Sequence, residues 1–442
     1  LDLLQQPIPP ELLPEYPQYE ELMLQEFAAA YVIPAGAPFQ PSQHQAARLV
    51  DFLLFNGVQV ERAKASFVMN EVQYPPGTYV VWLNQPKRGL ANTILEDGLD
   101  LSDIPGLYFY SPPTVWSNAR FWGAELAVME ERIEVATEEI REAAPPQGSV
   151  EEGPAAAYAY SPTSIAAIQA TNELLATGVT VHRTEVPFED SGRTFGAGTF
   201  LLPADVGLAN ELAQEYGLEV YALESQPESA TLLRQQRIAA MVPEGGQNLL
   251  ERFGFEFDAL SVQELNTGPD VAGYDLFVNS TVSLSDQGLS NKGRRALQDF
   301  FEAGGDYIGL GGNGSALPKE LGLMDFAGYN PPGNSIARVD LAAGDPISAG
   351  FGEESYVFVN SAVLFGDLGD GIEIAASLDE VDFFVSGYWP GWSTSGAHGM
   401  AVAVHKTMGE QDMTLIGFDA LFRAHPENGF RMVANAIYSG LE

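Results

Sequence analysis

Residues 307–315 read Tyr-Ile-Gly-Leu-Gly-Gly-Asn-Gly-Ser, a short apolar run that ends in a glycine cluster. An earlier apolar run, residues 274–279 (Tyr-Asp-Leu-Phe-Val-Asn), is separated from it by an amphipathic stretch over residues 291–303. Apolar strands that alternate with amphipathic helices are typical of a doubly wound sheet with helices on both faces. The stretch therefore predicts a doubly wound α/β domain, which we place over residues 236–442.

The same domain contains further strand and helix patterns on both sides of this stretch. We predict strands, in chain order, at residues 238–242, 356–359, 372–376, 383–386, 401–405 and 414–418. Residues 408–412 (Met-Gly-Glu-Gln-Asp) are typical of a hairpin turn between the last two of these strands. A helix over residues 428–438 is predicted to close the domain.

Two stretches nearer the N-terminus resemble each other. Gly57-Val58 corresponds to Gly178-Val179, and Gly77-Thr78 corresponds to Gly198-Thr199, so both pairs are 121 positions apart. Each stretch reads as an apolar strand, a helix, an alternating strand, a glycine turn, another strand and a second helix. The pattern predicts two small repeated α/β units.

Composition sets the boundaries of these parts. Residues 1–29 are rich in proline, glutamate and leucine, and the closely spaced prolines prevent a long helix there. Residues 144–154 (Ala-Pro-Pro-Gln-Gly-Ser-Val-Glu-Glu-Gly-Pro) have the composition of an exposed linker. We therefore predict one repeat unit at residues 30–143 and the other at residues 155–235.

The 442 residues include 60 acids and 21 bases, for a formal net charge of −39, and no cysteine. Binding to nucleic acid or to an anionic membrane surface is disfavoured, because both need a basic surface. The lack of cysteine excludes disulfides, thiolate metal sites and a cysteine nucleophile. No apolar run reaches the roughly 18 residues of a membrane span.

The excess of acids over bases favours an extracellular or periplasmic (secreted) protein, whose anionic surface stays soluble. The chain begins at Leu1 without an initiator methionine. We therefore expect a processed protein or a fragment of a longer one.

The glycine cluster is a candidate ligand-binding loop formed by Gly311, Gly312 and Asn313. At this place a doubly wound sheet can carry a phosphate-binding turn or a nucleophile elbow. An elbow needs a serine or cysteine on the turn, and Ser315 lacks the flanking glycines of the G-x-S-x-G pattern. The alternative, which we favour, is a tight structural turn.

A second candidate is the aromatic loop Tyr388-Trp389-Pro390-Gly391-Trp392. The rings of Tyr388, Trp389 and Trp392 could stack on a sugar ring or insert into a partner protein. The alternative, which we favour, is that these rings pack over one end of the domain core.

We assign no catalytic residue and no metal ligand. His182 and Glu185 have the H-x-x-E spacing of zinc ligands, but alternation along a strand would direct them to opposite faces. The acid clusters of the last domain do not follow the calcium-loop pattern. His425 precedes the closing helix without an identifiable nucleophile, so a structural role is favoured.

The last part of the chain contains the run Ile-Gly-Phe-Asp-Ala-Leu-Phe-Arg-Ala-His-Pro-Glu-Asn-Gly-Phe-Arg-Met-Val-Ala-Asn-Ala-Ile (residues 416–437). This run resembles the C-terminal end of large secreted bacterial proteins of the zinc carboxypeptidase (metallocarboxypeptidase) family. The stretches AYVIPAG (residues 30–36), FNGVQVERA (55–63) and YPPGTYVVWLNQP (74–86) resemble the region that follows the peptidase domain in that family. The resemblance covers most of residues 30–440.

The resemblance implies that residues 236–442 form a flavodoxin-like domain similar to class I glutamine amidotransferases. Those relatives rely on an elbow cysteine, so this domain is expected to lack its nucleophile. The family holds zinc with H-x-x-E and a distant histidine in its peptidase domain. We expect such a domain upstream, and therefore no cofactor in this chain.

The function expected from the resemblance is non-catalytic scaffolding or binding beside a peptidase, with the upstream domain or other copies of the chain as partners. Two alternatives remain open. One is that the chain belongs to an active secreted zinc metallocarboxypeptidase whose catalytic domain lies upstream. The other is a structural subunit of an extracellular assembly.

Overall fold

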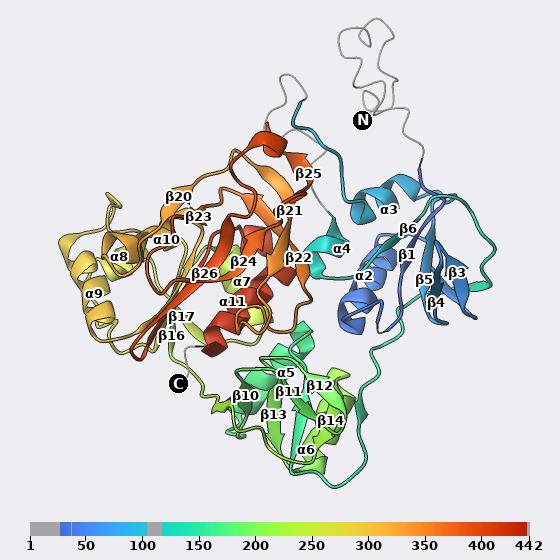
Figure 1. The fold of residues 1–442 in the computed structure, drawn as a ribbon, viewed down its shortest axis with the longest axis horizontal. Helices are drawn as coiled ribbons and strands as arrows, with labels where there is room; N and C mark the ends of the chain where they lie inside the picture. Colours follow the sequence, from blue (N-terminus) through green and yellow to red (C-terminus); the bar gives the residue numbers. More distant parts are fainter. Residues whose placement is uncertain (1–26, 37, 104–116, 440–442) are drawn as a thin grey trace, which may run out of the picture.

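The computed structural model describes residues 27–36, 38–103 and 117–439, and it is a mixed α/β structure with several sheets (Figure 1). We call residues 30–143 unit 1, residues 155–235 unit 2 and residues 236–439 the third domain. In Figure 1 unit 1 is blue to cyan, unit 2 is green, and the third domain is yellow to red. The predicted α/β class is confirmed. The proline-rich segment lies almost entirely outside the described residues.

Unit 1 is built on a sheet with the strand order β6-β1-β5-β2-β7. Its elements are β1 (Ala30–Ile33), α2 (Gln43–Phe55), β2 (Glu61–Ala63), β3 (Phe67–Met69), β4 (Val72–Tyr74), β5 (Tyr79–Trp82), α3 (Arg88–Leu95), α4 (Asn118–Trp122), β6 (Ala127–Met129) and β7 (Thr137–Glu139). Leu49, Val50 and Leu53 of α2 are buried, because their helical spacing places them on one face.

Unit 2 is built on a sheet with the strand order β15-β10-β13-β9-β14-β8. Its elements are β9 (Ala157–Tyr160), α5 (Ile165–Ala176), β10 (His182–Thr184), β11 (Phe188–Asp190), β12 (Arg193–Phe195), β13 (Phe200–Pro203), α6 (Val206–Tyr216), β14 (Glu219–Leu223) and β15 (Ala230–Leu232). The edge strand β8 (Ser149–Val150) comes from the segment predicted as a linker and pairs with β14.

The sheets of the two units have the same strand order when the strands are matched by their place in the chain, β6-β1-β5-β2-β7 against β14-β9-β13-β10-β15. The registers match as well. Arg62 lies opposite Tyr79, and Arg183 lies opposite Phe200, 121 positions later in both cases. The alternating strand predicted at Val58–Val60 was placed too early, because the first ladder pair of β2 is at Glu61.

The third domain contains parallel strands in the order β17-β16-β18-β19-β27, which is 2-1-3-4-5 in chain order. This is the order of flavodoxin-like sheets. The parallel strands and the helices of the domain are β16 (Ile238–Met241), α7 (Glu244–Arg252), β17 (Phe257–Ala259), α8 (Val262–Leu265), β18 (Leu276–Asn279), α9 (Asn291–Glu302), β19 (Asp306–Leu310), α10 (Gly311–Glu320), β27 (Gln411–Ile416) and α11 (Glu427–Ser439).

Antiparallel strands extend this sheet beyond β27 in the order β26-β24-β21-β22. The remaining elements are β20 (Ala327–Tyr329), β21 (Asn334–Leu341), β22 (Glu354–Asn360), β23 (Leu364–Gly366), β24 (Glu373–Leu378), β25 (Phe384–Tyr388), β26 (Ala401–Met408) and the 3₁₀ turns η3 (Trp392–Thr394) and η4 (Phe422–Ala424). The predicted hairpin between β26 and β27 is confirmed, since Met408 pairs with Gln411 across a two-residue turn.

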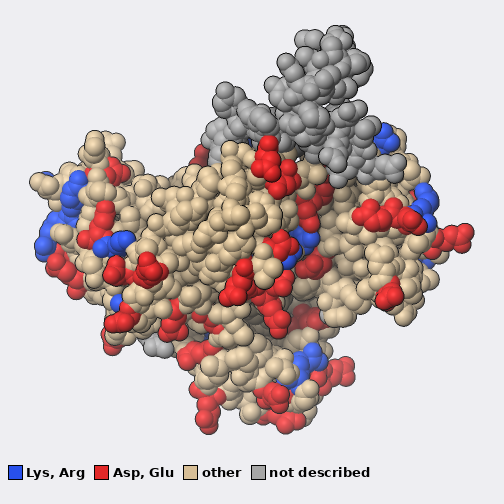
Figure 2. Space-filling view, turned by 45° about the horizontal axis from the view of Figure 1, so that its top comes forward, with Lys and Arg blue, Asp and Glu red and all other residues tan. Residues whose placement is uncertain are grey.

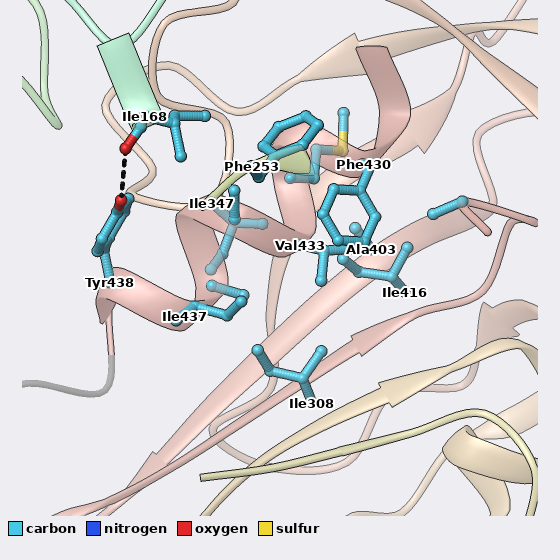
Figure 3. Packing of buried hydrophobic residues seen from close by; sticks show 14 of the residues in the cluster. Ile168, Phe253, Ile308, Ile347, Ala403, Ile416, Phe430, Val433, Ile437 and Tyr438 are labelled. Atoms are coloured by element: carbon cyan, nitrogen blue, oxygen red, sulfur yellow. Dashed lines mark hydrogen bonds between the residues drawn. The ribbon is translucent and has the colours of Figure 1, made fainter. Parts of the chain in front are cut away.

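Helix α11 lies at the centre of the main hydrophobic core (Figure 3). Phe430, Val433 and Ile437 on its inner face belong to the same buried cluster as Ile308 of β19 and Ile416 of β27. Its residues from Glu427 to Tyr438 are all buried. A helix that is buried all round must be covered on every side, and the covering parts here include both units.

Acidic side chains lie over all three parts of the surface on the face drawn in Figure 2. Within the described residues, no helix combines the length and the apolar character needed to cross a membrane.

Candidate functional site

Strand β19 passes into helix α10 without an intervening loop, since β19 ends at Leu310 and α10 begins at Gly311. Gly311 has φ +61°, in the left-handed region that residues with a side chain rarely adopt. A sharp turn between a strand and a helix is where a nucleophile elbow presents its serine or cysteine. Gly311 has no side chain, so this elbow turn (Leu310–Gly312) carries no nucleophile.

The predicted loop residues form the first turn of α10. Gly312 and Asn313 are exposed, and the Asn313 side-chain amide donates to the Thr281 carbonyl oxygen at 3.3 Å. Ser315, the serine we considered as a nucleophile, is 1% exposed inside α10. The position of Gly311 was missed because the elbow was sought at a serine. The ligand-binding role of Gly311, Gly312 and Asn313 stays a prediction.

Glycines also let α10 approach the sheet closely. A Cβ atom on Gly314 would lie 2.2 Å from the Asn279 carbonyl oxygen, and one on Gly309 would lie 2.6 Å from the Gly314 carbonyl oxygen. A Cβ on Gly312 would have no other atom within 4 Å. The close contact of helix and sheet therefore depends on Gly309 and Gly314.

Sheets with this strand order bind ligands outside the carboxyl ends of the strands, where the order reverses, which here is between β16 and β18. The chain's own groups lie at this place. The Thr281 hydroxyl donates to the Met241 carbonyl oxygen at 3.1 Å, and a Cβ on Gly245 of α7 would lie 3.0 Å from the Leu421 carbonyl oxygen. These contacts narrow the usual ligand position of the fold.

The aromatic loop packs on the third domain. Trp389 is fully buried, and its ring centroid lies 4.8 Å from that of Phe383. The Trp392 ring stacks on Phe384 with the centroids 5.1 Å apart, while Tyr388 ends β25. This arrangement agrees with the packing alternative, because the Trp389 ring offers no surface to a ligand in this structure.

Residues 99–102 of unit 1 attach to the same loop. The Gly387 amide donates to the Leu99 carbonyl oxygen, and the Leu101 amide donates to the Gly387 carbonyl oxygen, both at 2.8 Å. The indole N–H of Trp392 donates to the Asp100 carboxylate at 3.2 Å. Unit 1 thus adds a short strand to β25, so the aromatic loop is a junction between two parts of the protein.

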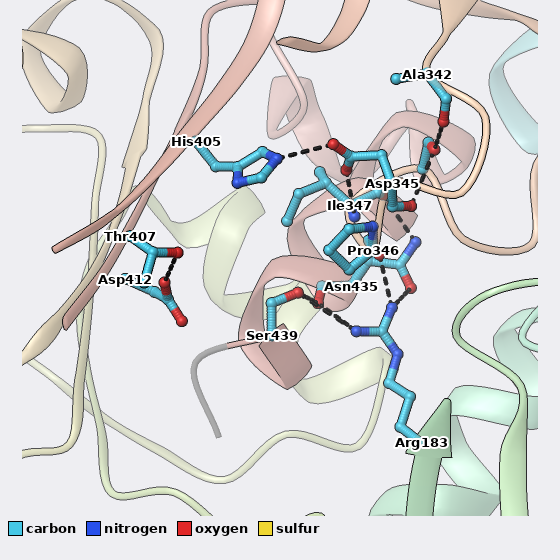
Figure 4. Close-up of polar contacts among 11 residues, drawn as sticks. Arg183, Ala342, Asp345, Pro346, Ile347, His405, Thr407, Asp412, Asn435 and Ser439 are labelled. Atoms are coloured by element: carbon cyan, nitrogen blue, oxygen red, sulfur yellow. Dashed lines mark hydrogen bonds and ion pairs between the residues drawn. The ribbon is translucent and has the colours of Figure 1, made fainter. Parts of the chain in front are cut away.

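Arg183 joins unit 2 to the third domain (Figure 4). Its side chain extends from β10 to the C-terminal end of α11 and is 4% exposed. The guanidinium donates to the Pro346 carbonyl oxygen at 2.7 Å and to the Asn435 side-chain oxygen and the Ser439 hydroxyl, both at 3.3 Å. Burial lowers the pKa of Arg183 to about 10. A cation at a helix C-terminus is stabilised by the helix dipole.

A cavity of about 430 Å³ lies beside Arg183, between unit 2 and strands β24 and β26. His405 in its wall pairs with the Asp345 carboxylate at 2.8 Å. Burial lowers the pKa of His405, but the hydrogen bond and charge of Asp345 outweigh burial and raise this pKa above its usual value. Glu373 and Asp412 add negative charge, so the cavity favours a cationic or hydroxyl-bearing ligand over an anion.

Glu427 joins unit 1 to the third domain. Its carboxylate is fully buried and forms ion pairs with Arg48 of α2 and Arg252 of α7. On the same helix α2, the His44 ring nitrogen Nε2 lies 2.6 Å from the Tyr216 carbonyl oxygen of unit 2. These contacts connect all three parts of the chain.

His425 lies next to this junction, where its ring contacts Phe121 and Trp122 of α4 with centroids 5.1 and 6.0 Å apart. Burial lowers the pKa of His425 to about 4. The neutral ring therefore packs between unit 1 and the third domain at neutral pH, which agrees with the structural role favoured for it.

The H-x-x-E pair of unit 2 lies apart from these contacts. His182 pairs with Leu201 in the sheet, and the Glu185 carboxylate accepts a hydrogen bond from the Thr231 hydroxyl. In the parts of the chain that the structure describes, no group of three or more histidine, aspartate or glutamate side chains is arranged to hold a metal ion.

Comparison with protein-family models and with curated proteins gives no match. Among solved structures, a GMP synthase protein from Thermoplasma acidophilum is similar over 46% of this chain and 94% of its own, at 14% identity and a TM-score of 0.33. A glutamine amidotransferase from Thermotoga maritima is similar over 48% of this chain and 100% of its own, at 12% identity and a TM-score of 0.32. Similarities this low carry no functional assignment.

The glycine contacts of α10 give a first prediction. Gly314→Ala should lower the free energy of unfolding by about 1–3 kcal/mol, because the new methyl group would overlap the Asn279 carbonyl oxygen. Gly312→Ala is the matched control, with open space around the new methyl group, and should leave this free energy unchanged or raise it by up to about 1 kcal/mol. Urea denaturation measures both; equal losses in the two variants would contradict the close packing.

The Arg183 contacts give a second prediction. Arg183→Met should lower the free energy of unfolding by about 2–4 kcal/mol, because it leaves buried oxygens of Pro346 and Asn435 without a donor. Arg62→Met is the matched control, since Arg62 has the same place in unit 1 but is half exposed and should cost under about 1 kcal/mol. If both variants lose the same stability in urea, Arg183 does not hold unit 2 in place.

The low pKa of His425 gives a third prediction. The unfolded chain binds a proton at this residue below pH 6.5, whereas the folded chain binds it only near pH 4, so acid favours unfolding in this window. From pH 7 to pH 5 the wild-type protein should lose about 2 kcal/mol more unfolding free energy than His425→Gln. Urea denaturation at the two pH values measures this difference. Parallel pH dependence in the two proteins would show that His425 does not titrate in this way.

Proposed function

We propose that this chain is a non-catalytic accessory region that scaffolds or binds beside a catalytic domain in a secreted protein of the zinc carboxypeptidase family. Gly311 on the elbow turn is the observation that carries the proposal. In a glutamine amidotransferase-like third domain, this turn would have to present the nucleophile. A glycine there removes the reacting group while the turn itself is kept.

The strand order of the parallel sheet supports the glutamine amidotransferase-like assignment of the third domain, since doubly wound sheets of the order 2-1-3-4-5 carry functional groups at strand-to-helix turns. The shared strand order and ladder register of units 1 and 2 support their origin as repeats. The acidic composition supports a secreted location.

The junctions support a scaffolding role in particular. Arg183 holds unit 2, Glu427 holds unit 1, and residues 99–102 extend the sheet of the third domain. Buried ion pairs and backbone pairing at each junction disfavour independent movement of the parts, because opening them would expose or strand charged groups. Zinc would be held in the upstream peptidase domain rather than by these residues.

The proposal is tested by activity and by the size of the native protein. The purified chain should release no ammonia from glutamine and no C-terminal amino acid from peptides, with or without added zinc. The native protein in the secreted fraction should exceed the 47.6 kDa of this chain and should carry H-x-x-E upstream. Turnover of either substrate by the chain alone, or a native protein of 47.6 kDa that stays inside the cell, would contradict the proposal.

A further inference from the structure

Unit 1 has an open cavity of about 600 Å³ on the face where β1, β2 and β5 meet. Ala35, Arg62, Gly77 and Tyr79 are among the residues that line it. The Arg62 guanidinium pairs with Glu138 at 2.7 Å on one side, and its side chain remains 39% exposed. A cation in an open cavity is unusual in a chain with a net charge of −39.

The same face of unit 2 is occupied. Arg183, Gly198 and Phe200 stand 121 positions after Arg62, Gly77 and Tyr79 and have the same places in the sheet. Arg183 donates to the Pro346 carbonyl oxygen, as described above. A Cβ on Gly198 would lie 2.3 Å from the Ala349 Cβ, and the Phe200 ring lies 5.4 Å from that of Tyr438.

A further equivalent position completes the match. Pro162 follows β9 at the same distance at which Ala35 follows β1. A Cβ on Gly350 would lie 2.7 Å from the Pro162 carbonyl oxygen, which also accepts a hydrogen bond from Arg431. The turn formed by residues 346–350, which contains a proline and small side chains, is thus seated on unit 2 at the positions that line the open cavity of unit 1.

We propose that the unit 1 cavity is the docking site for a polypeptide turn of a partner protein, held as the turn at residues 346–350 is held on unit 2. A backbone carbonyl of the partner accepts from Arg62, and a proline with small side chains fills the space above Gly77. Lys64 stands where unit 2 has Glu185, so the partner turn carries an acidic residue beside its proline, as Asp345-Pro346 does. This names the partner chemistry of the scaffolding role and rests on it.

A second copy of the chain does not offer this turn, because its own residues 346–350 are already seated on its unit 2. The partner is therefore a different protein or domain that displays an acidic residue, a proline and small residues on an exposed turn.

The test uses the full chain and a fluorescent peptide of residues 342–351, Ala-Ala-Gly-Asp-Pro-Ile-Ser-Ala-Gly-Phe. Fluorescence anisotropy should show saturable binding of one peptide per chain. Arg62→Ala should weaken binding at least tenfold, because it removes the donor to the peptide carbonyl. Ala35→Trp should do the same by filling the cavity, and Arg141→Ala, an exposed arginine outside the cavity, should leave binding unchanged.

A scrambled peptide of the same composition that binds equally well would overturn the proposal, as would binding that neither Arg62→Ala nor Ala35→Trp weakens. Absence of any binding by the wild-type chain would overturn it too. Sedimentation that reveals a dimer abolished by Ala35→Trp would assign the cavity to a second copy and overturn the proposed partner. Catalytic turnover by the chain would contradict the proposed function while leaving peptide binding measurable, so the two failures are distinguishable.

Discussion

The burial of helix α11 is the constraint on which the rest of the structure depends. Its first turn holds Glu427 between arginines of unit 1 and α7, its middle packs on the parallel sheet, and its last turn receives Arg183 from unit 2. An acid at the N-terminus and a cation at the C-terminus both complement the helix dipole. Buried charges are costly without partners, so each unit fits only where it supplies the partner that α11 requires.

Much of the fold could be predicted from local sequence. The apolar runs that became β16, β18 and β19 are short and continuous, as buried parallel strands are, and the hairpin of β26 and β27 has its glycine at the turn. Strand β21 was not predicted, because its register shifts between Ile336 and Ala337 and interrupts the alternation that marks a strand. The repeat was visible because its spacing of 121 positions is unchanged through the glycine turns.

The candidate site was less accessible to sequence reasoning. The elbow turn depends on the φ angle of Gly311, and a glycine gives no chemical signal of a nucleophile position. Arg183 makes its hydrogen bonds with residues 163 and 252 positions away, so no local pattern could mark it as buried. The repeat does offer a signal, because it equates Arg183 with Arg62 and asks why one arginine is enclosed and the other open.

The position of α11 after both units in the chain has a consequence for synthesis on the ribosome. Translation at about 5–20 residues per second separates Arg183 from Asn435, 252 positions later, by roughly 10–50 s. During that interval unit 2 can form its own sheet, but its arginine faces water and the cell's other proteins. Assembly of the three parts is therefore a late event that starts only when the closing helix has left the exit tunnel.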